Sequence, residues 1–512
     1  MITPRQVTDF SHDAVVVIPG ILGSSLIDDN GRERWGLADP RWYASALLRR
    51  DGLQALYLTE QERAGTVVRL RPGRLLRTPA FLPGLGGIEP YTELISRIQQ
   101  VVVDQAAVRE FPYDWRLGVA HNARLLDEAC HEHLRSWRAS EAHLQARRLR
   151  PDEREAQLVL VAHSMGGLLV RALSLIPGAI DEIRAVVTLG TPYRGSPLAA
   201  VMLATGRGTP LPLPAARMRA LAATLPGLHD LLPSYRCVDD GDEVRVLSAA
   251  DVTALGGDAQ LAEDAARLHA RLDARHDPAL TGDPSGPGST GPSKADYAAF
   301  GGFDEVAARQ ARLDALTRAV VGVAQPTTQT LSLSDGILTQ HRYTFGVHAD
   351  GELVRDEHGM LVHIDRAGDG TVPRVSAHRD GAPGLAQQHS ALAKTRESID
   401  LACAVITGAD LDLGGRLGDG DLGVAVPEVV LPAQPWSVTV TGADSPAALT
   451  LSIADTASNW RIYPRLGWRD GDLRAEVDVP QPGLYRVIAD GAGTSAVTAM
   501  VLAADPNAPG ET

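Results

Sequence analysis

The sequence predicts an α/β protein in which helices cover a parallel sheet, followed by a small all-β unit. Runs of apolar, mostly β-branched residues bounded by turn residues, such as 13–20 and 185–189, are typical of strands buried on both faces. These runs alternate with segments that carry apolar residues at helical spacing, which predicts βαβ units and a doubly wound sheet. Short β-type runs then alternate with turn residues over 425–505, which predicts a β-sandwich.

The elements of the predicted sheet follow one another in a regular order. Strands are expected at 13–20, 107–111, the first part of 157–176, 185–189, 319–324 and 329–333, and helices at 91–100, 119–145 and the second part of 157–176.

The alternation stops between about 197 and 315, where proline-punctuated, partly helical sequence predicts a lid or cap inserted into the α/β domain. Within it, residues 281–293 are too poor in apolar residues to pack, which predicts a flexible loop. The glycine-rich stretch 414–423 is typical of a linker. We therefore expect an α/β domain over 1–412 and a β-sandwich domain over 425–505.

The composition is that of a globular protein large enough for more than one core: 512 residues, 44% hydrophobic and 22% charged. A net charge of −14 disfavours nucleic acid and non-specific adhesion to anionic membranes. The three cysteines lie far apart, which argues against a disulfide framework or a zinc site. No stretch approaches the roughly 18 apolar residues of a membrane span, and the first residues lack the apolar core of a secretory signal, which predicts a cytoplasmic protein.

The most informative segment is Leu158-Val-Leu-Val-Ala-His-Ser-Met-Gly-Gly-Leu-Leu-Val170, where an apolar run leads into Ser164 and then a helical pattern. A sharp strand-to-helix turn of this kind raises a serine hydroxyl above the sheet edge, and the small residues Ala162 and Gly166 let the chain pack closely there. The segment predicts the nucleophile elbow of an α/β-hydrolase fold. A solvated Ser/Gly turn is the alternative.

A serine nucleophile requires a histidine base and a carboxylate to orient it, in the chain order Ser, acid, His for this fold. Asp369 lies in a glycine-flanked loop after the strand-like residues 361–364, and His389 follows twenty residues later. Asp365 is the rival acid and His378 the nearest rival base. A structural turn aspartate and a solvated or helix-capping histidine are the alternative roles of the two residues.

The same chemistry requires two backbone N–H donors for the oxyanion of the tetrahedral intermediate. Met165, directly after the nucleophile, supplies one. The other is expected from Ile21 or Leu22, in the glycine-bounded loop after the first strand. A dinucleotide site in that loop is disfavoured because the spacing is not G-x-G-x-x-G.

Several motifs together resemble one family: Val17-Ile-Pro-Gly-Ile-Leu-Gly-Ser24, Pro112-Tyr-Asp-Trp-Arg116, Ala162-His-Ser-Met-Gly166, Gly190-Thr-Pro-Tyr-Arg-Gly-Ser196, Gly368-Asp-Gly-Thr-Val-Pro373 and His389. The chain resembles the lecithin:cholesterol acyltransferase family, with its lysosomal phospholipase A2 and phospholipid:diacylglycerol acyltransferase members. The resemblance implies a triad of Ser164, Asp369 and His389, an oxyanion hole at Ile21 or Leu22 with Met165, and a mobile lid.

In two respects the chain departs from this family: the disulfide of the lid is missing, and no secretory signal is recognised although many members are secreted or lumenal. Trp35 and Trp42 stand where the family carries a disulfide-closed lid with a lipid-contacting tryptophan, but no cysteine pair closes that region here. They are interpreted either as lipid contacts or as core aromatics. Asp114 and Arg116 are expected to brace loops, and Tyr193 to shape the pocket.

The sequence therefore predicts a serine lipid acyl hydrolase or O-acyltransferase, of phospholipase or lipase type, that cleaves glycerolipid esters through an acyl-Ser164 intermediate without metal or organic cofactor. Transient contact with a membrane or lipid aggregate through a local apolar patch is compatible with this function. A non-lipid carboxylesterase or thioesterase is the second hypothesis. The third is a catalytically silent hydrolase scaffold whose β-sandwich binds a partner that the sequence does not identify.

Overall fold

A computed structural model describes residues 10–36, 52–76, 91–149, 154–208, 214–273, 300–334, 336–348, 351–377, 382, 384–409, 422–427, 429–443, 445–456, 458–469, 472–491 and 496–503. Several sequence predictions lie outside these residues: Trp42, His378, the tract 281–293 and most of the stretch 414–423.

The centre of the molecule is a six-stranded sheet in which every neighbouring pair is parallel. Across the sheet the strands are β15 (Gly384–Ala386), β10 (Thr317–Val323), β7 (Ile183–Leu189), β6 (Leu158–His163), β1 (Ala14–Ile18) and β5 (Val108–Glu110). All five residues of β1 and all six of β6 are buried, as expected for strands covered on both faces. The predicted α/β class is confirmed.

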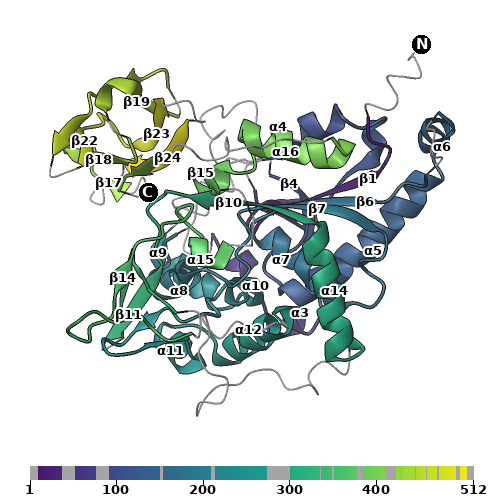
Figure 1. Ribbon diagram of the computed structural model, residues 1–512, viewed down its shortest axis with the longest axis horizontal. Coiled ribbons are helices and arrows are strands. Elements are labelled where there is room, and N and C mark those ends of the chain that lie inside the picture. Colours follow the sequence, from purple (N-terminus) through teal and green to yellow (C-terminus); the bar gives the residue numbers. More distant parts are fainter. Residues whose placement is uncertain are drawn as a thin grey trace.

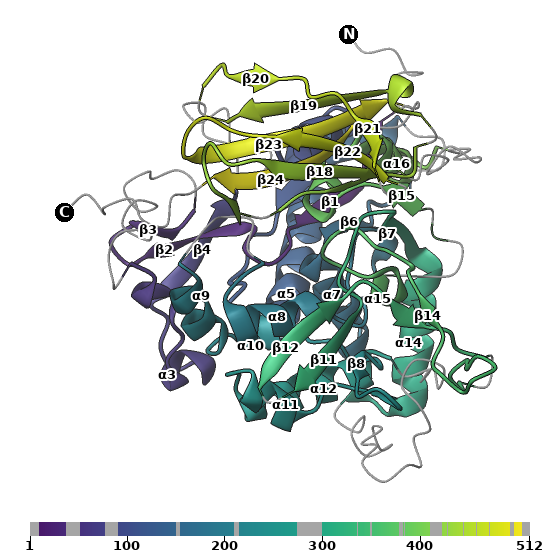
Figure 2. The same ribbon diagram turned by 90° about the vertical axis from the view of Figure 1, so that its left-hand side faces the viewer.

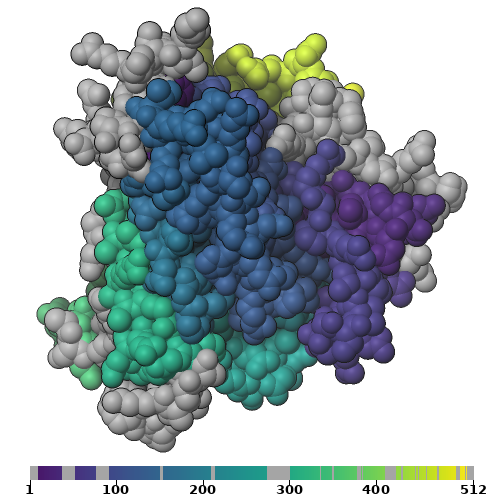
Figure 3. All heavy atoms as spheres, turned by 90° about the vertical axis from the view of Figure 1, so that its right-hand side faces the viewer, coloured from purple at the N-terminus to yellow at the C-terminus, as the bar shows by residue number. Residues whose placement is uncertain are grey.

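Helices cover both faces of this sheet (Figure 1). One layer holds α4 (Tyr91–Gln99) and α16 (Arg396–Thr407), and the other holds α5 (Val119–Arg138), α7 (Met165–Ala172) and α14 (Phe303–Leu316). The face seen in Figure 3 is covered mainly by the blue surface of α5 and its neighbours, between the green α14 and the purple N-terminal segment.

The prediction of one helix over 119–145 is wrong. The α5 helix ends at Arg138, and a second helix, α6 (Glu141–Arg148), begins after Ser140. The Ser140 hydroxyl accepts the N–H of His143 at 3.2 Å, which is the N-cap bond that starts a new helix.

Between β7 and α14 the chain leaves the central sheet and forms a largely helical insertion. Its elements are α8 (Pro197–Thr205), α9 (Ala215–Ala222), α10 (Pro226–His229), β8 (Val238–Asp239), β9 (Val244–Arg245), α11 (Ala249–Ala254) and α12 (Ala259–Leu272). Figures 1 and 2 show these elements gathered on one side of the central sheet.

A second excursion follows β10 and joins the first. The prediction that 329–333 continues the central sheet is wrong, because β11 (Thr330–Ser334) pairs with β12 (Ile337–His341) and β8 in a separate sheet. The predicted strand at 361–364 shortens to β14 (His363–Ile364), which pairs with β13 (Thr344–Phe345). The chain then returns through α15 (Arg374–Ala377) to β15.

A three-stranded sheet and short helical turns lie between β1 and α4. They are β2 (Ser24–Asp28), β3 (Glu33–Trp35), β4 (Leu70–Leu75), η1 (Gln54–Leu56) and α3 (Glu60–Arg63). Their apolar residues belong to the same core as the central sheet.

The tail forms two packed sheets with their own core, as the predicted β-sandwich requires. One sheet holds β16 (Gly423–Ala425), β18 (Trp436–Thr441), β22 (Asp472–Val477) and β21 (Gly467–Arg469); the other holds β17 (Val429–Val430), β24 (Val497–Ala503), β23 (Gly483–Gly491), β19 (Leu449–Asp455) and β20 (Arg461–Ile462). In Figures 1 and 2 the sandwich lies next to β15.

Among the described residues, no helix combines the length and the apolar character needed to cross a bilayer.

A buried ion-pair cluster fixes the amino-terminal end of the central sheet. The fully buried Asp13, directly before β1, contacts Arg154 at 2.8 Å and Arg184 at 2.7 Å, and accepts the N–H of Gln157 at 2.8 Å. Burial alone raises the pKa of Asp13, but these hydrogen bonds and charges outweigh it and hold the pKa below its ordinary value.

We expect Asp13→Asn to lower the free energy of unfolding by about 2–3 kcal/mol, because it removes the charge that compensates two partly buried arginines. Because the folded-state pKa is lowered, this contribution is complete above the unfolded pKa near 3.8 and disappears as the pH falls through the folded value. Urea denaturation at neutral pH measures the change. The control is Asp29→Asn, which breaks an exposed pair with Arg71; an equal loss in both variants would contradict the assignment.

Candidate active site

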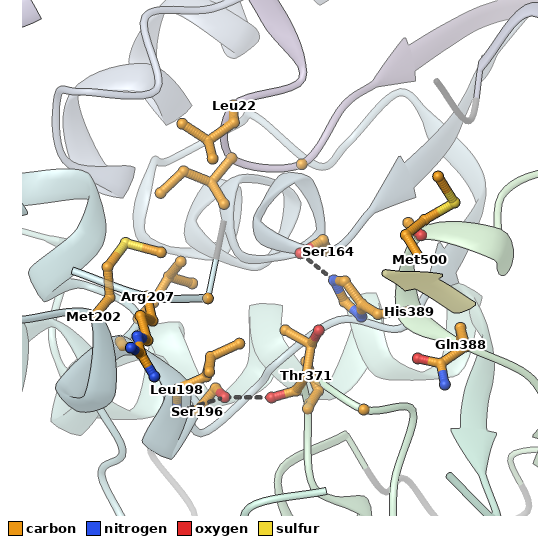
Figure 4. Close-up of a pocket in the computed structure, with 18 of the residues that line it drawn as sticks. Leu22, Ser164, Ser196, Leu198, Met202, Arg207, Thr371, Gln388, His389 and Met500 are labelled. Carbon is orange, nitrogen blue, oxygen red and sulfur yellow. Dashed lines mark hydrogen bonds between the residues drawn. The ribbon is translucent and has the colours of Figure 1, made fainter. Parts of the chain in front are cut away.

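Ser164 occupies the junction between β6 and α7. Its backbone has φ 52° and ψ −127°, a conformation that a residue with a side chain rarely adopts. The Ser164 N–H is held by the carbonyl of Leu189 at the end of β7, at 2.9 Å. The turn is therefore fixed by the neighbouring strand, and the hydroxyl projects above the carboxyl end of the sheet, into the cavity shown in Figure 4.

Gly166 allows the helix to start directly after this turn. A Cβ at Gly166 would lie 2.5 Å from the carbonyl oxygen of Pro19 and 2.8 Å from that of Ile18. The sequence pattern predicted a close approach between the elbow's own strand and helix. The approach that excludes a side chain at Gly166 is between α7 and the end of the adjacent strand β1.

The structure brings Ser164, His389 and Asp369 together by hydrogen bonds. His389 Nε2 lies 2.8 Å from Ser164 Oγ, and His389 Nδ1 lies 2.7 Å from Asp369 Oδ2 (Figure 4 draws the first bond). Since a carboxylate only accepts, Nδ1 carries the proton and Nε2 is left to accept from the serine hydroxyl. This is the arrangement that allows a histidine to take a proton from a serine.

The carboxylate of Asp369 is held firmly in this orientation. It is fully buried, and its Oδ1 accepts the N–H groups of Thr371 at 3.0 Å and Val372 at 2.6 Å. The Asp369 carbonyl also accepts the His389 N–H at 2.8 Å, so the loops of the acid and the base are joined through their backbones.

Asp365, the rival acid, does not meet the histidine. Its Oδ1 accepts from Gln329 Nε2 at 2.7 Å and from the Ala367 N–H at 2.8 Å. These bonds close the loop that leads to Asp369.

Gly190, the first residue after β7, lies against Asp369 and His389. Its φ is +60°, and a Cβ there would lie 3.1 Å from His389 Nδ1, 3.2 Å from Asp369 Oδ2 and 2.8 Å from Leu392 Cδ1. A side chain at this position would displace the histidine or the aspartate.

A buried hydrogen-bond chain runs behind the site and was missed by the sequence reasoning. The Gly20 N–H donates to Tyr91 Oη at 2.8 Å, Tyr91 donates to His163 Nδ1 at 2.9 Å, and His163 Nε2 donates to the His389 carbonyl at 3.1 Å. Burial, with repulsion from His389, lowers the pKa of His163 to about 3, so His163 stays neutral and keeps this direction of donation. In the sequence, the one signal that could have indicated this hydrogen-bond chain was His163, directly before Ser164.

The loop expected to supply an oxyanion donor is a tight turn after β1. The Gly23 N–H bonds to the Gly20 carbonyl at 3.1 Å, and Leu22 has φ +63°. Ile21 and Leu22 line the same cavity as Ser164. Met165 is the first residue of α7, where an amide has no acceptor within its own helix.

Trp35 belongs to the core of this region. It is 1% exposed, and its Nε1 donates to the Leu22 carbonyl at 2.9 Å, so it braces the turn while one edge reaches the cavity. It also packs edge to face on Trp115, with ring centroids 5.1 Å apart.

The Tyr-Asp-Trp-Arg segment holds the same loop from the other side. Tyr113 Oη donates to the Pro19 carbonyl at 3.1 Å, and its N–H donates to Ser24 Oγ at 3.1 Å. Trp115 Nε1 donates to the Ser24 carbonyl at 3.1 Å. These buried bonds fix both ends of the turn that contains Ile21 and Leu22.

Asp114 and Arg116 form a buried two-bond pair, with Nε and Nη2 of the arginine 2.9 and 2.7 Å from the carboxylate. Arg116 also reaches Glu62 at 3.4 Å, which ties in α3. Tyr193 lies in the loop after β7; its hydroxyl shares a hydrogen bond with Thr188 at 2.8 Å, and it is not among the residues that line the cavity.

The cavity above Ser164 has a volume of about 810 Å³ and is lined largely by apolar side chains. The insertion contributes one wall, which we call the insertion wall: Leu198, Met202, Met218, Leu221, Leu225 and Leu228. Among the described residues, the charged side chains of the lining are Arg207, Arg342 and Lys394, and no aspartate or glutamate joins them.

No cluster of three or more histidine, cysteine, aspartate or glutamate side chains suited to a metal ion occurs in the described part of the chain.

The fold is that of an α/β-hydrolase, with Ser164 at the strand-to-helix turn. The predicted family resemblance is confirmed: residues 80–255 match the sequence model of the family described as lecithin:cholesterol acyltransferase. The matched segment contains the Tyr-Asp-Trp-Arg motif, Ser164 and the Gly190–Ser196 loop, whereas the first-strand loop, Asp369 and His389 lie outside it.

Two solved structures are similar to this chain at low sequence identity. The Tle4–Tli4 complex contains a chain that is 16% identical, with 78% of this chain and 99% of that chain covered and a TM-score of 0.41. The lipase BlEst2 of Bacillus licheniformis in its propeptide form is 11% identical, with 95% and 73% covered and a TM-score of 0.30. A comparison with curated proteins found no match.

We expect Gly190→Ala to slow the reaction of Ser164 with a small fluorophosphonate by about 100-fold, because displacing a reacting group by about 1 Å has an effect of that size. Gly178→Ala is the matched control. Gly178 also has a positive φ, of 83°, but the nearest atom to an added Cβ is 4.0 Å away. Similar rates in the two variants would show that Gly190 does not position the acid and the base.

Proposed function

We propose that the protein is a serine acyl hydrolase or O-acyltransferase that cleaves glycerolipid esters through an acyl-Ser164 intermediate. The observation that carries this proposal is the hydrogen-bonded series Ser164–His389–Asp369 at the floor of a large apolar cavity. The match to the lecithin:cholesterol acyltransferase family supports the same chemistry.

In the first half-reaction, Ser164 Oγ attacks the ester carbonyl while His389 Nε2 takes the hydroxyl proton. The tetrahedral intermediate collapses when His389 returns that proton to the leaving alcohol oxygen, which leaves an acyl-Ser164 ester. Asp369 stabilises the imidazolium that exists between these steps. The oxyanion is assigned to the amides of Met165 and of Ile21 or Leu22.

In the second half-reaction, water or an alcohol donates its proton to His389 Nε2 and attacks the acyl-enzyme. Water gives a free fatty acid, and an alcohol gives a new ester. His389 then returns the proton to Ser164.

The lining of the cavity favours a lipid over a short soluble ester. Every side chain of the insertion wall is a leucine or a methionine, which suits the binding of a hydrocarbon chain. Within the described lining, the charged side chains Arg207, Arg342 and Lys394 are all cationic, and in a protein of net charge −14 they favour a head group that carries phosphate. A phospholipid satisfies both conditions.

We expect Ser164→Ala to abolish turnover of glycerolipid. Wild-type protein and the variant are incubated with a mixed extract of phospholipids and neutral lipids, and the products are identified by mass spectrometry. Loss of a glycerolipid that depends on Ser164, with a free fatty acid or a new ester formed, supports the proposal and identifies the acceptor. If Ser164 reacts with a small phosphonate but no lipid is consumed, the substrate is a soluble ester; if it does not react, the site is catalytically silent.

We expect Asp369→Asn to lower kcat by about 10⁴-fold, because the amide cannot stabilise the imidazolium and favours the wrong tautomer of His389. Asp365→Asn makes the same substitution four residues away, at a carboxylate that bonds Gln329, and we expect its kcat to stay within a few-fold of wild type. The hydrolysis of a chromogenic ester measures both, and circular dichroism establishes that each variant is folded. The reverse order of effects would assign Asp365 as the acid.

A further inference from the structure

The β-sandwich contributes residues directly to the cavity that contains Ser164. Seven of its described residues line that cavity: Val424, Ala425, Val426, Leu484, Thr498, Ala499 and Met500. Figure 4 shows Met500 on the His389 side of Ser164, whereas Leu198 and Met202 of the insertion wall lie on the other side. The lining residues of the sandwich and the insertion wall therefore lie on opposite sides of Ser164.

The strand pattern of β24 explains how Met500 reaches the cavity. Val497 and Val501 are buried in the core of the sandwich, and alternate residues of a strand point to opposite faces. Thr498 and Met500 therefore lie on the outer face of the sheet, where both are half-buried and line the cavity. On the neighbouring β23, Leu484 packs against the core of the α/β domain.

A buried glutamine joins the sandwich to the loop of the catalytic acid. Gln325 is fully buried; its Oε1 accepts the Val424 N–H at 3.2 Å and its Nε2 donates to the Leu422 carbonyl at 2.8 Å. The backbone of the same residue exchanges hydrogen bonds of 2.9 and 3.2 Å with Gly368, next to Asp369. The position of β16 is thereby set relative to the acid.

Two further glutamines, directly before His389, make a second connection. Gln387 Nε2 donates to the Ala496 carbonyl at 3.0 Å, and Gln388 Nε2 lies 3.4 Å from the Val424 carbonyl. The sandwich is thus attached to the segment that carries His389. These hydrogen bonds fix the position of its cavity-lining residues relative to His389.

We propose that the β-sandwich is a part of the substrate-binding site, a role that rests on the proposed function. Its cavity-facing residues Val426, Leu484, Thr498 and Met500, which we call the sandwich wall, bind a hydrocarbon portion of the lipid on the His389 side of Ser164. The side chains are apolar apart from one hydroxyl, and the cations of the lining, Arg207, Arg342 and Lys394, come from other parts of the chain. The surface therefore suits an acyl chain and not a head group.

The test compares how fast Ser164 of the full-length protein is phosphonylated by hexadecyl and by ethyl fluorophosphonate. In the wild type we expect the long-chain probe to react faster. Met500→Glu places a charge on the sandwich wall, and we expect the ratio of long-chain to short-chain rate constants to fall about tenfold or more. The matched controls are Met360→Glu and Leu431→Glu, at side chains that are 62% and 47% exposed and outside the cavity lining, and both should keep the wild-type ratio.

Met500→Ala provides a second variant for the case in which the charged variant does not fold; it shortens the side chain, and we expect a several-fold fall in the same ratio. A folded Met500 variant with the wild-type ratio, or a wild type without preference for the long chain, overturns the role of the sandwich wall. Failure of the proposed function is read separately: a catalytically silent site reacts with neither probe, and an enzyme of soluble esters reacts with the ethyl probe but consumes no glycerolipid in the mass-spectrometric experiment.

Discussion

The backbone conformation of Ser164 is the constraint on which the rest of the site depends. A serine at φ 52° is unfavourable on its own and persists because the surrounding chain leaves no alternative. The strand before Ser164 is fully buried, and the N–H of Ser164 is held by a carbonyl at the end of β7. The helix after Ser164 begins with Gly166 packed against the carbonyl groups at the end of β1. Three strands of the central sheet therefore fix the position of the Ser164 hydroxyl.

The same junction sets the positions of the groups around the serine. The chain from Gly20 through Tyr91 and His163 to the His389 carbonyl connects the turn expected to bind the oxyanion with the segment that carries the base. Each hydrogen bond in it has one possible direction, because a backbone N–H donates at one end and a carbonyl accepts at the other. A neutral His163 is required throughout, and its lowered pKa supplies that state. The network thus connects the turn after β1 with the His389 segment without carrying charge.

What the sequence predicted well was local or ordered along the chain. The strand and helix around Ser164 follow from a short pattern. The chain order serine, acid, histidine pointed to Asp369 and His389, which the structure joins to Ser164 by hydrogen bonds, while their catalytic roles stay a prediction. What it missed depends on contacts between distant residues: Tyr91 and His163 are 72 positions apart. The pairing of β11 with β8 is equally invisible to periodicity, since a strand pattern does not identify its partner. The sequence also predicted the sandwich without its place at the cavity.

If the proposed function holds, the insertion wall and the sandwich wall also bear on the choice between water and alcohol as acyl acceptor. Ser164 is 6% exposed and the His389 side chain 13%, so an acceptor approaches them through the cavity and not from the open surface. When the hydrocarbon chain of the acyl-enzyme packs on one of the two apolar walls, the other wall stays accessible to an acceptor beside His389. An alcohol with its own hydrocarbon chain can bind there and exclude water, whereas a small acceptor gains nothing from that wall. Under the proposed function, the sandwich would therefore act on the second half-reaction as much as on the first, because it would decide which hydroxyl reaches His389.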